Sequence, residues 1–115
     1  MIVLEDSKGN VFGGFFSVSM EMKKNFYGTG SSFLFKKGEN DLAIYGSTMN
    51  NNYFLFSDHD GIGMGSDEYY GLFIDNSLCK GSSHGCKTYY NDVLSTDTHF
   101  KIKRLEIWGF YEPGE

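Results

Sequence analysis

The sequence has little of what marks a secreted or membrane-spanning protein. It contains two cysteines, Cys79 and Cys86, and no N-x-S/T glycosylation site, whereas small secreted domains are usually rich in disulfides. No window comes near the run of about 20 apolar residues that crosses a bilayer, and the apolar start at residues 1–6 is far too short for a signal peptide. These absences predict a soluble, cytoplasmic protein without a transmembrane segment. A disulfide between the two cysteines stays open at this stage.

A basic stretch is also missing. Ten Lys and Arg residues stand against fifteen Asp and Glu residues, and the net charge is −5. The longest cationic cluster, residues 101–104, alternates with apolar residues and is typical of a half-exposed strand. Because nucleic-acid binding needs clustered cations that displace counterions from phosphates, the sequence argues against a nucleic-acid partner.

Proline is nearly absent too, while glycine and aromatic residues are abundant. Pro113 stands alone, against 15 Gly, 11 Phe and 8 Tyr. Aromatic residues favour strands, and glycines mark turns, bulges and close backbone approaches. At 115 residues the chain is long enough for one core but not for two independent ones. We expect a single, mainly β domain over residues 1–115.

Apolar runs separated by polar turns predict strands at intervals of roughly ten residues, the spacing of an antiparallel two-sheet β-sandwich. Residues 19–26 fit neither the helical nor the strand period and are expected to form a loop or a short helix. In the last apolar run the buried face changes parity near Lys103 and Arg104, which indicates a bulge or burial on both faces. The expected strands lie at residues 1–5, 11–18, 33–37, 42–46, 53–57, 69–75 and 100–110.

The stretch GSSHGCKTYYNDVLS, residues 81–95, places His84 two residues before Cys86. A thiol nucleophile needs a thiolate, stabilised by a base or a positive environment within hydrogen-bond reach. The small polar residues before Cys86 are typical of a turn, so the mutual reach of the two side chains is open. We favour a structural thiol. The alternative is redox chemistry at Cys86, with Cys79 as the resolving thiol.

Other candidate sites have weaker patterns. Asp58 and Asp60, in SDHDG, lack the spacing of a calcium loop, and the His and Cys residues form no C-x2-C or H-x3-H pair. GTGSS, at residues 28–32, lacks the lysine and the following helix of a phosphate loop. We therefore expect neither a metal site nor a phosphate-loop nucleotide site.

Four segments together resemble the TLDc domain, which is shared by oxidation-resistance proteins, a nuclear receptor coactivator and a TBC-domain protein of vesicle traffic. Their order and spacing match almost the whole chain. The family domain is longer on its N-terminal side, so the chain resembles its C-terminal two-thirds. That relation would explain a strand that begins at Met1 without a cap, where we expect an exposed sheet edge unless other residues or a partner cover it. The segments are GNVFGGFFS (9–17), FYGTGSSFLF (26–35), YYGLFIDNSLCKGSSHGCKTYYNDVLS (69–95) and FKIKRLEIWGF (100–110).

The resemblance implies a two-sheet β-sandwich with small marginal helices, no catalytic centre and no cofactor. It implies a protein-interaction module that acts in oxidative-stress resistance and contacts peripheral subunits of the vacuolar proton pump, the V-ATPase. Such a role places the protein in the cytoplasm and peripherally at endolysosomal membranes. It also implies that residues 81–95 form a structured connection between two strands, held by Gly81, Ser83, His84, Cys86, Thr88, Asn91, Leu94 and Ser95.

The candidate contact patch comprises Asp67, Glu68, Tyr69 and Tyr70, where acidic and aromatic residues lie together. A solvated loop is the alternative for this stretch. A further interpretation of the whole chain is a glycan-binding sandwich that uses Tyr and Trp faces with Asp or Asn oxygens.

Overall fold

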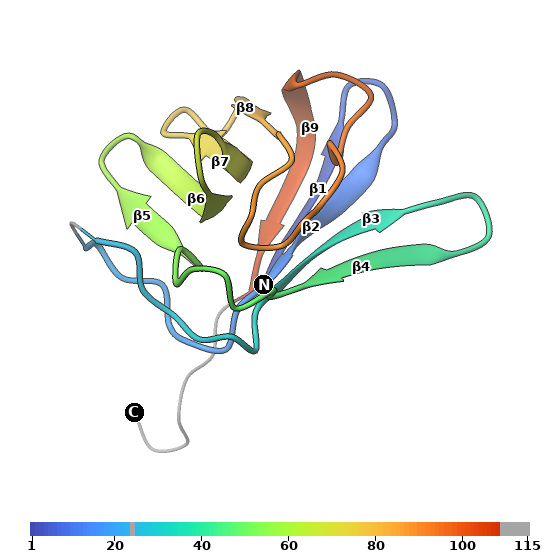
Figure 1. The fold of residues 1–115 in the computed structure, drawn as a ribbon. Coiled ribbons are helices and arrows are strands. Elements are labelled where there is room, and N and C mark those ends of the chain that lie inside the picture. Colours follow the sequence, from blue (N-terminus) through green and yellow to red (C-terminus); the bar gives the residue numbers. More distant parts are fainter. Residues whose placement is uncertain (24, 109–115) are drawn as a thin grey trace, which may run out of the picture.

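The computed structural model describes residues 1–23 and 25–108, and this part of the chain is built from strands and loops without a helix. It therefore offers no helical segment able to span a membrane. Figure 1 shows the arrangement. The strands are β1 (Ile2–Asp6), β2 (Val11–Phe15), β3 (Phe33–Lys37), β4 (Leu42–Gly46), β5 (Phe56–Asp58), β6 (Gly61–Ser66), β7 (Tyr70–Asp75), β8 (Lys80–Ser82) and β9 (His99–Ile107).

Hydrogen bonds join these strands into one antiparallel sheet with the order β4-β3-β2-β1-β9-β8-β7-β6-β5. The long strand β9 makes the sheet continuous: residues 99–101 pair with β8, and residues 102–107 pair with β1. The expected division into two separate sheets and the expected marginal helices are therefore not confirmed. Strand spacing alone does not reveal that one long strand hydrogen-bonds on both sides.

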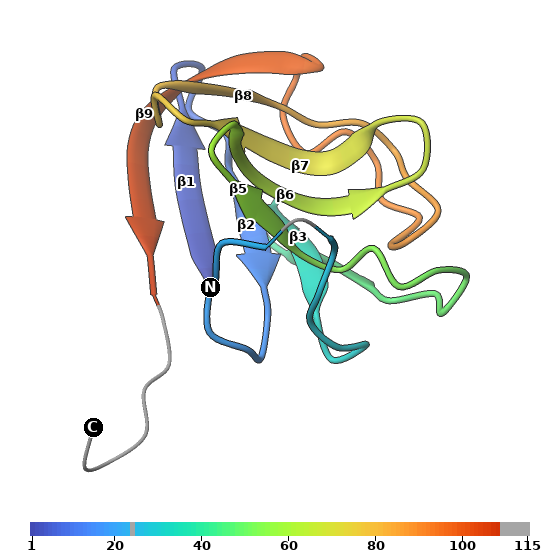
Figure 2. The ribbon, with the colours of Figure 1, turned by 90° about the vertical axis from the view of Figure 1, so that its left-hand side faces the viewer.

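The two halves of the sheet fold over and face each other. Figure 2 shows β5 and β6 lying in front of β2 and β3. Close approach needs glycine at the contact, because a Cβ on Gly71 in β7 would lie 2.9 Å from Leu34 Cδ1 in β3. Phe12 in β2 and Phe100 in β9 meet edge to face with ring centroids 5.0 Å apart. The core lies between the halves and includes Ile2, Leu4, Phe12, Leu34, Leu55, Met64, Leu72, Ile74, Tyr89 and Leu94.

The edges of the sheet are β4 and β5. The edge at Met1, expected to be exposed unless other residues or a partner cover it, is covered within the chain, because β1 lies between β2 and β9 and pairs with both. Chain position does not fix sheet position, since β9 returns to cover the side of β1 that β2 leaves open. The outer face of β4 keeps Leu42 and Ile44 exposed.

Most predicted strands appear close to their predicted residues, and β3 and β4 begin and end where the pattern placed them. The parity change in β9 is explained by a bulge, because Glu5 pairs with Arg104 and Asp6 with Ile102, which leaves Lys103 as the extra residue. The end of that predicted strand, residues 109–110, lies outside the described residues. Residues 19–23 and 25–26 form a loop, not a helix.

Candidate functional site

The turn between β6 and β7 carries most of the predicted contact patch. The Asp67 carboxylate accepts hydrogen bonds from the backbone N–H of Glu68, the residue that follows it, and from that of Lys87 (2.9 Å). Burial alone would raise the pKa of Asp67, but the backbone hydrogen bonds from Glu68, Lys87 and Tyr69 outweigh it and hold this pKa below its ordinary value. Asp67 therefore stays ionised at neutral pH and ties the turn to the connection that precedes β9.

Tyr69 and His84 meet on the surface beside this turn. Their rings stack with centroids 4.4 Å apart and an interplanar angle of 22°. The backbone N–H of His84 donates to the Tyr70 carbonyl (3.1 Å), which fixes the two segments side by side. Although it stacks on His84, the Tyr69 side chain is 56% exposed. We call Asp67, Glu68, Tyr69 and His84 the Tyr69 surface.

Tyr70 lies apart from the Tyr69 surface. Its ring is half-buried and stacks on Phe73 at 5.0 Å, within a row of rings that continues to Phe56 and Phe26. Burial raises the pKa of Tyr70, and the negative charges of nearby carboxylates add to the effect. Strand alternation separates the neighbours Tyr69 and Tyr70, so the structure brings three of the four predicted contact residues together with His84, while Tyr70 packs among other aromatic residues.

Cys86 does not have the environment of a redox thiol. It is 4% exposed, its Sγ donates to Asn91 Oδ1 at 3.2 Å, and burial raises its pKa. A reactive thiol needs the opposite, a lowered pKa and access. Cys79 is exposed, and both cysteines are free thiols, so no disulfide joins them. The His84 ring packs on Tyr69, as described above, and the structure gives the redox alternative no support.

The connection predicted at residues 81–95 lies at residues 83–98 in the structure, between β8 and β9, because Gly81 and Ser82 belong to β8. The Ser83 hydroxyl donates to the Gly71 carbonyl (2.7 Å) and accepts from the Leu94 N–H (2.9 Å). The Asn91 side-chain amide donates to the His84 carbonyl at 2.9 Å. The small polar residues of this stretch thus satisfy buried backbone groups, and the interpretation of the stretch as structural is confirmed.

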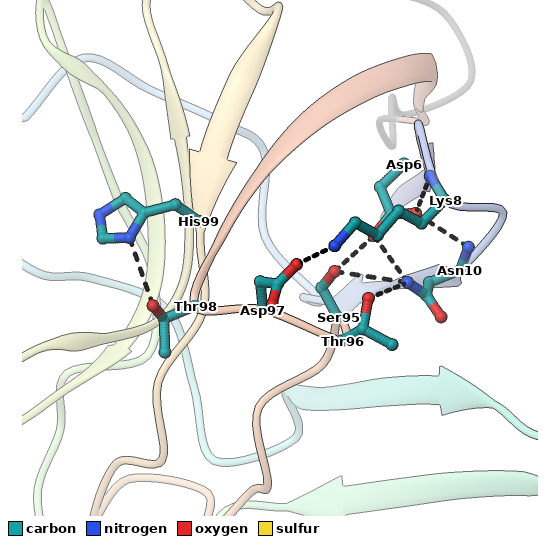
Figure 3. Close-up of polar contacts among 8 residues, drawn as sticks. All are labelled: Asp6, Lys8, Asn10, Ser95, Thr96, Asp97, Thr98 and His99. Atoms are coloured by element: carbon teal, nitrogen blue, oxygen red, sulfur yellow. Dashed lines mark hydrogen bonds and ion pairs between the residues drawn. The ribbon is translucent and has the colours of Figure 1, made fainter.

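A pocket of about 450 Å³ lies on another part of the surface, where β8, β9, the β1–β2 turn and residues 95–97 meet. Asp6 is buried beside it, and its carboxylate accepts hydrogen bonds from the backbone N–H groups of Lys8 (3.0 Å) and Asn10 (2.9 Å), from the Asn10 amide (2.9 Å) and from the Ser95 hydroxyl. Figure 3 shows this network. Burial would raise the pKa of Asp6, yet the bonds from Ser95, Asn10 and Lys8 together lower it.

Charged side chains from several segments line the same pocket. Lys8 forms an exposed ion pair with Asp97 across the opening (Figure 3). Lys80, Lys101 and His99 complete the rim. Within residues 1–23 and 25–108, no three His, Cys, Asp or Glu side chains are grouped to hold a metal ion.

Sequence reasoning missed this pocket. The expected strands at residues 1–5 and 11–18 do imply a turn between them, and Asp6 beside such a turn is typical of side-chain to backbone capping. The partners of Asp6 and Lys8 lie 89 residues away in the chain, at Ser95 and Asp97. No local pattern connects positions so distant.

Comparison with known proteins identifies relatives across nearly the whole chain. Residues 1–111 match the family model described as the TLDc domain. The chain is 36% identical over 123 residues to the MTOR-associated protein MEAK7 of Homo sapiens, covering 98% of the chain and 27% of that protein. It is 37% identical over 112 residues to Oxidation resistance protein 1 of Homo sapiens, covering 96% of the chain and 13% of that protein. The chain therefore spans about a quarter and about an eighth of the length of these two relatives.

Proposed function

The chain belongs to the TLDc domain family, and from this premise we propose that it is a non-enzymatic protein-interaction module that serves oxidative-stress resistance. Its proposed partner is the peripheral sector of the V-ATPase. The proposed location is the cytoplasm, with peripheral attachment at endolysosomal membranes. The name of one relative supports a role in oxidation resistance, and the name of the other, an mTOR-associated protein, supports action through a protein partner.

The Tyr69 surface is the observation that carries the proposal. Exposed aromatic side chains that are held rigidly contribute strongly to protein interfaces, because little conformational entropy is lost when they are buried. Here one face of the Tyr69 ring stacks on the His84 ring. The Asp67 carboxylate holds the turn in place by accepting a hydrogen bond from the Lys87 backbone N–H. Glu68, exposed beside them, adds a negative charge at the rim. The arrangement fits a partner with an apolar pocket bordered by cationic groups.

A binding measurement with purified V-ATPase peripheral subunits tests the proposal. We expect Tyr69→Ala to weaken binding by at least about tenfold, the effect of losing one interface anchor. Tyr53→Ala is the matched control, because Tyr53 is also an exposed tyrosine (45%) but packs on Phe26 in the separate aromatic row. Equal binding by both variants would exclude the Tyr69 surface as the contact with the partner. Absence of binding by the unmodified protein would exclude this partner, and mTOR-associated complexes would then be tested in the same format.

A further inference from the structure

The pocket beside Asp6 collects positive charge on an acidic protein. Three lysines reach its rim from three separate segments: Lys8 from the β1–β2 turn, Lys80 from β8 and Lys101 from β9. The whole chain has a net charge of −5, so this grouping is not a consequence of composition. The volume, about 450 Å³, is sufficient for a small molecule.

Lys80 and Lys101 are directly opposite each other in the antiparallel pairing of β8 and β9. Side chains in such a pair project on the same face with Cβ atoms about 5 Å apart, and like charges in this position destabilise the sheet. Lys80 has a long ion pair of 3.9 Å with Asp75. Lys101 has no ion pair within the described part of the chain. The pair therefore leaves positive charge uncompensated at the pocket.

Two carboxylates, Asp6 and Asp97, line the same pocket as the three lysines and offset part of this charge, but not all of it. Asp6 is buried and already accepts four hydrogen bonds, so it has little capacity for a lysine. Asp97 pairs with Lys8, but both side chains are more than half exposed and such pairs open at little cost. His99 also lines the pocket: its Nδ1 contacts the Thr98 hydroxyl (3.3 Å), and its ring meets the His84 ring edge to face with centroids 6.2 Å apart.

We propose that this pocket binds a small oxyanion, a phosphate or carboxylate group, between Lys80 and Lys101. Lys8 contributes when it leaves Asp97. The ammonium groups of lysine are suited to such ligands as point charges. The site adjoins the Tyr69 surface at one point, where the His99 and His84 rings meet edge to face with centroids 6.2 Å apart, but its existence does not depend on the proposed protein partner.

The experiment is an NMR titration of the ¹⁵N-labelled protein with inorganic phosphate in one arm and acetate in the other, so that the preferred anion is identified. Sodium chloride at matched ionic strength controls for screening. We expect saturable shifts of the amide signals of Gly81, Phe100 and Lys101 with at least one of the two anions. Lys101→Gln should weaken the affinity for that anion by at least about tenfold, because one charge-assisted contact is lost.

Two further variants test the charge argument. Asp97→Asn should raise the affinity, since it removes the carboxylate that competes for Lys8. Lys37→Gln is the matched control, because Lys37 is another exposed lysine at a strand end but lies outside the pocket. Lys101→Arg keeps the charge and should retain binding. This variant provides the test if Lys101→Gln does not fold. Either of two results would overturn the proposal. One is amide shifts of the same size with sodium chloride as with phosphate and acetate, and the other is an unchanged anion affinity in well-folded Lys101→Gln.

Discussion

Asp6→Asn tests how much the buried carboxylate beside the pocket contributes to the fold. Asp6 is 1% exposed and accepts four hydrogen bonds, two at each oxygen. An asparagine keeps the oxygen that faces the backbone N–H groups of Lys8 and Asn10. Its NH₂ group then faces the Asn10 amide, which loses its acceptor, while the Ser95 hydroxyl can rotate to accept.

The expected cost is about 2–3 kcal/mol, the value of one lost hydrogen bond to a charged group together with the weakening of the others. For a domain of this size that corresponds to a melting temperature lower by about 10 °C. Urea unfolding followed by far-ultraviolet circular dichroism measures the free-energy difference. Asp97→Asn is the control, because it removes an exposed carboxylate from the same region and should leave stability almost unchanged.

The same substitution should change the pH dependence of stability. The pKa of Asp6 is lowered in the folded protein from its ordinary value of 3.8. A lowered folded pKa means that the stabilisation is present above pH 3.8 and is lost as the pH falls from there through the folded pKa. Asp6→Asn should remove that part of the acid dependence. A variant as stable as Asp97→Asn, with an unchanged acid profile, would refute the role assigned to the carboxylate.

The remaining predictions concern the thiols, the core and the sheet edge. A thiol reagent should modify Cys79 rapidly in the native protein and Cys86 only on unfolding, because the latter is buried; fast modification of both would contradict this. Gly71→Ala should destabilise the fold by about 1–3 kcal/mol in urea unfolding, since its Cβ would lie 2.9 Å from the Leu34 side chain; a neutral effect would show that the halves separate easily. The open β4 edge should cause concentration-dependent association in sedimentation velocity, and Ile44→Lys should reduce it with little loss of stability; a monomer at all concentrations would exclude this.

Local sequence patterns located most of the sheet, because alternation and turn residues act over a few positions. They failed at β6 and β8, where glycine and serine replace the apolar alternation: β6 reads GIGMGS and β8 reads KGS. These strands are determined by their neighbours, since small residues there permit close approach and the hydrogen bonds come from β5, β7 and β9.

In the candidate site, too, the sequence predicted local features, whereas contacts between distant residues came only from the structure. The sequence placed Asp67 and Glu68 just before an expected strand at residues 69–75, and the structure begins that strand at Tyr70, which leaves Tyr69 in the turn. It placed His84 and Cys86 in a structured connection, where the structure also has them. It could not show that the Tyr69 ring stacks on His84, because those residues are 15 positions apart and meet through the pairing of β7 and β8. Nor could it show whether Cys86 is a thiolate or a buried thiol, since that depends on what packs around it.

By itself, then, the sequence determined the β class, the turns, the parity change in β9 and the membership of the TLDc family, all of which rest on residue types at short or fixed spacing. Only the tertiary structure decided that the nine strands form one continuous sheet, that Cys86 is buried, and that Lys8, Lys80 and Lys101 share one pocket. The reason is physical: propensity and alternation act between neighbours in the chain, whereas burial, pKa and charge pairing depend on which distant segments the folded core brings together.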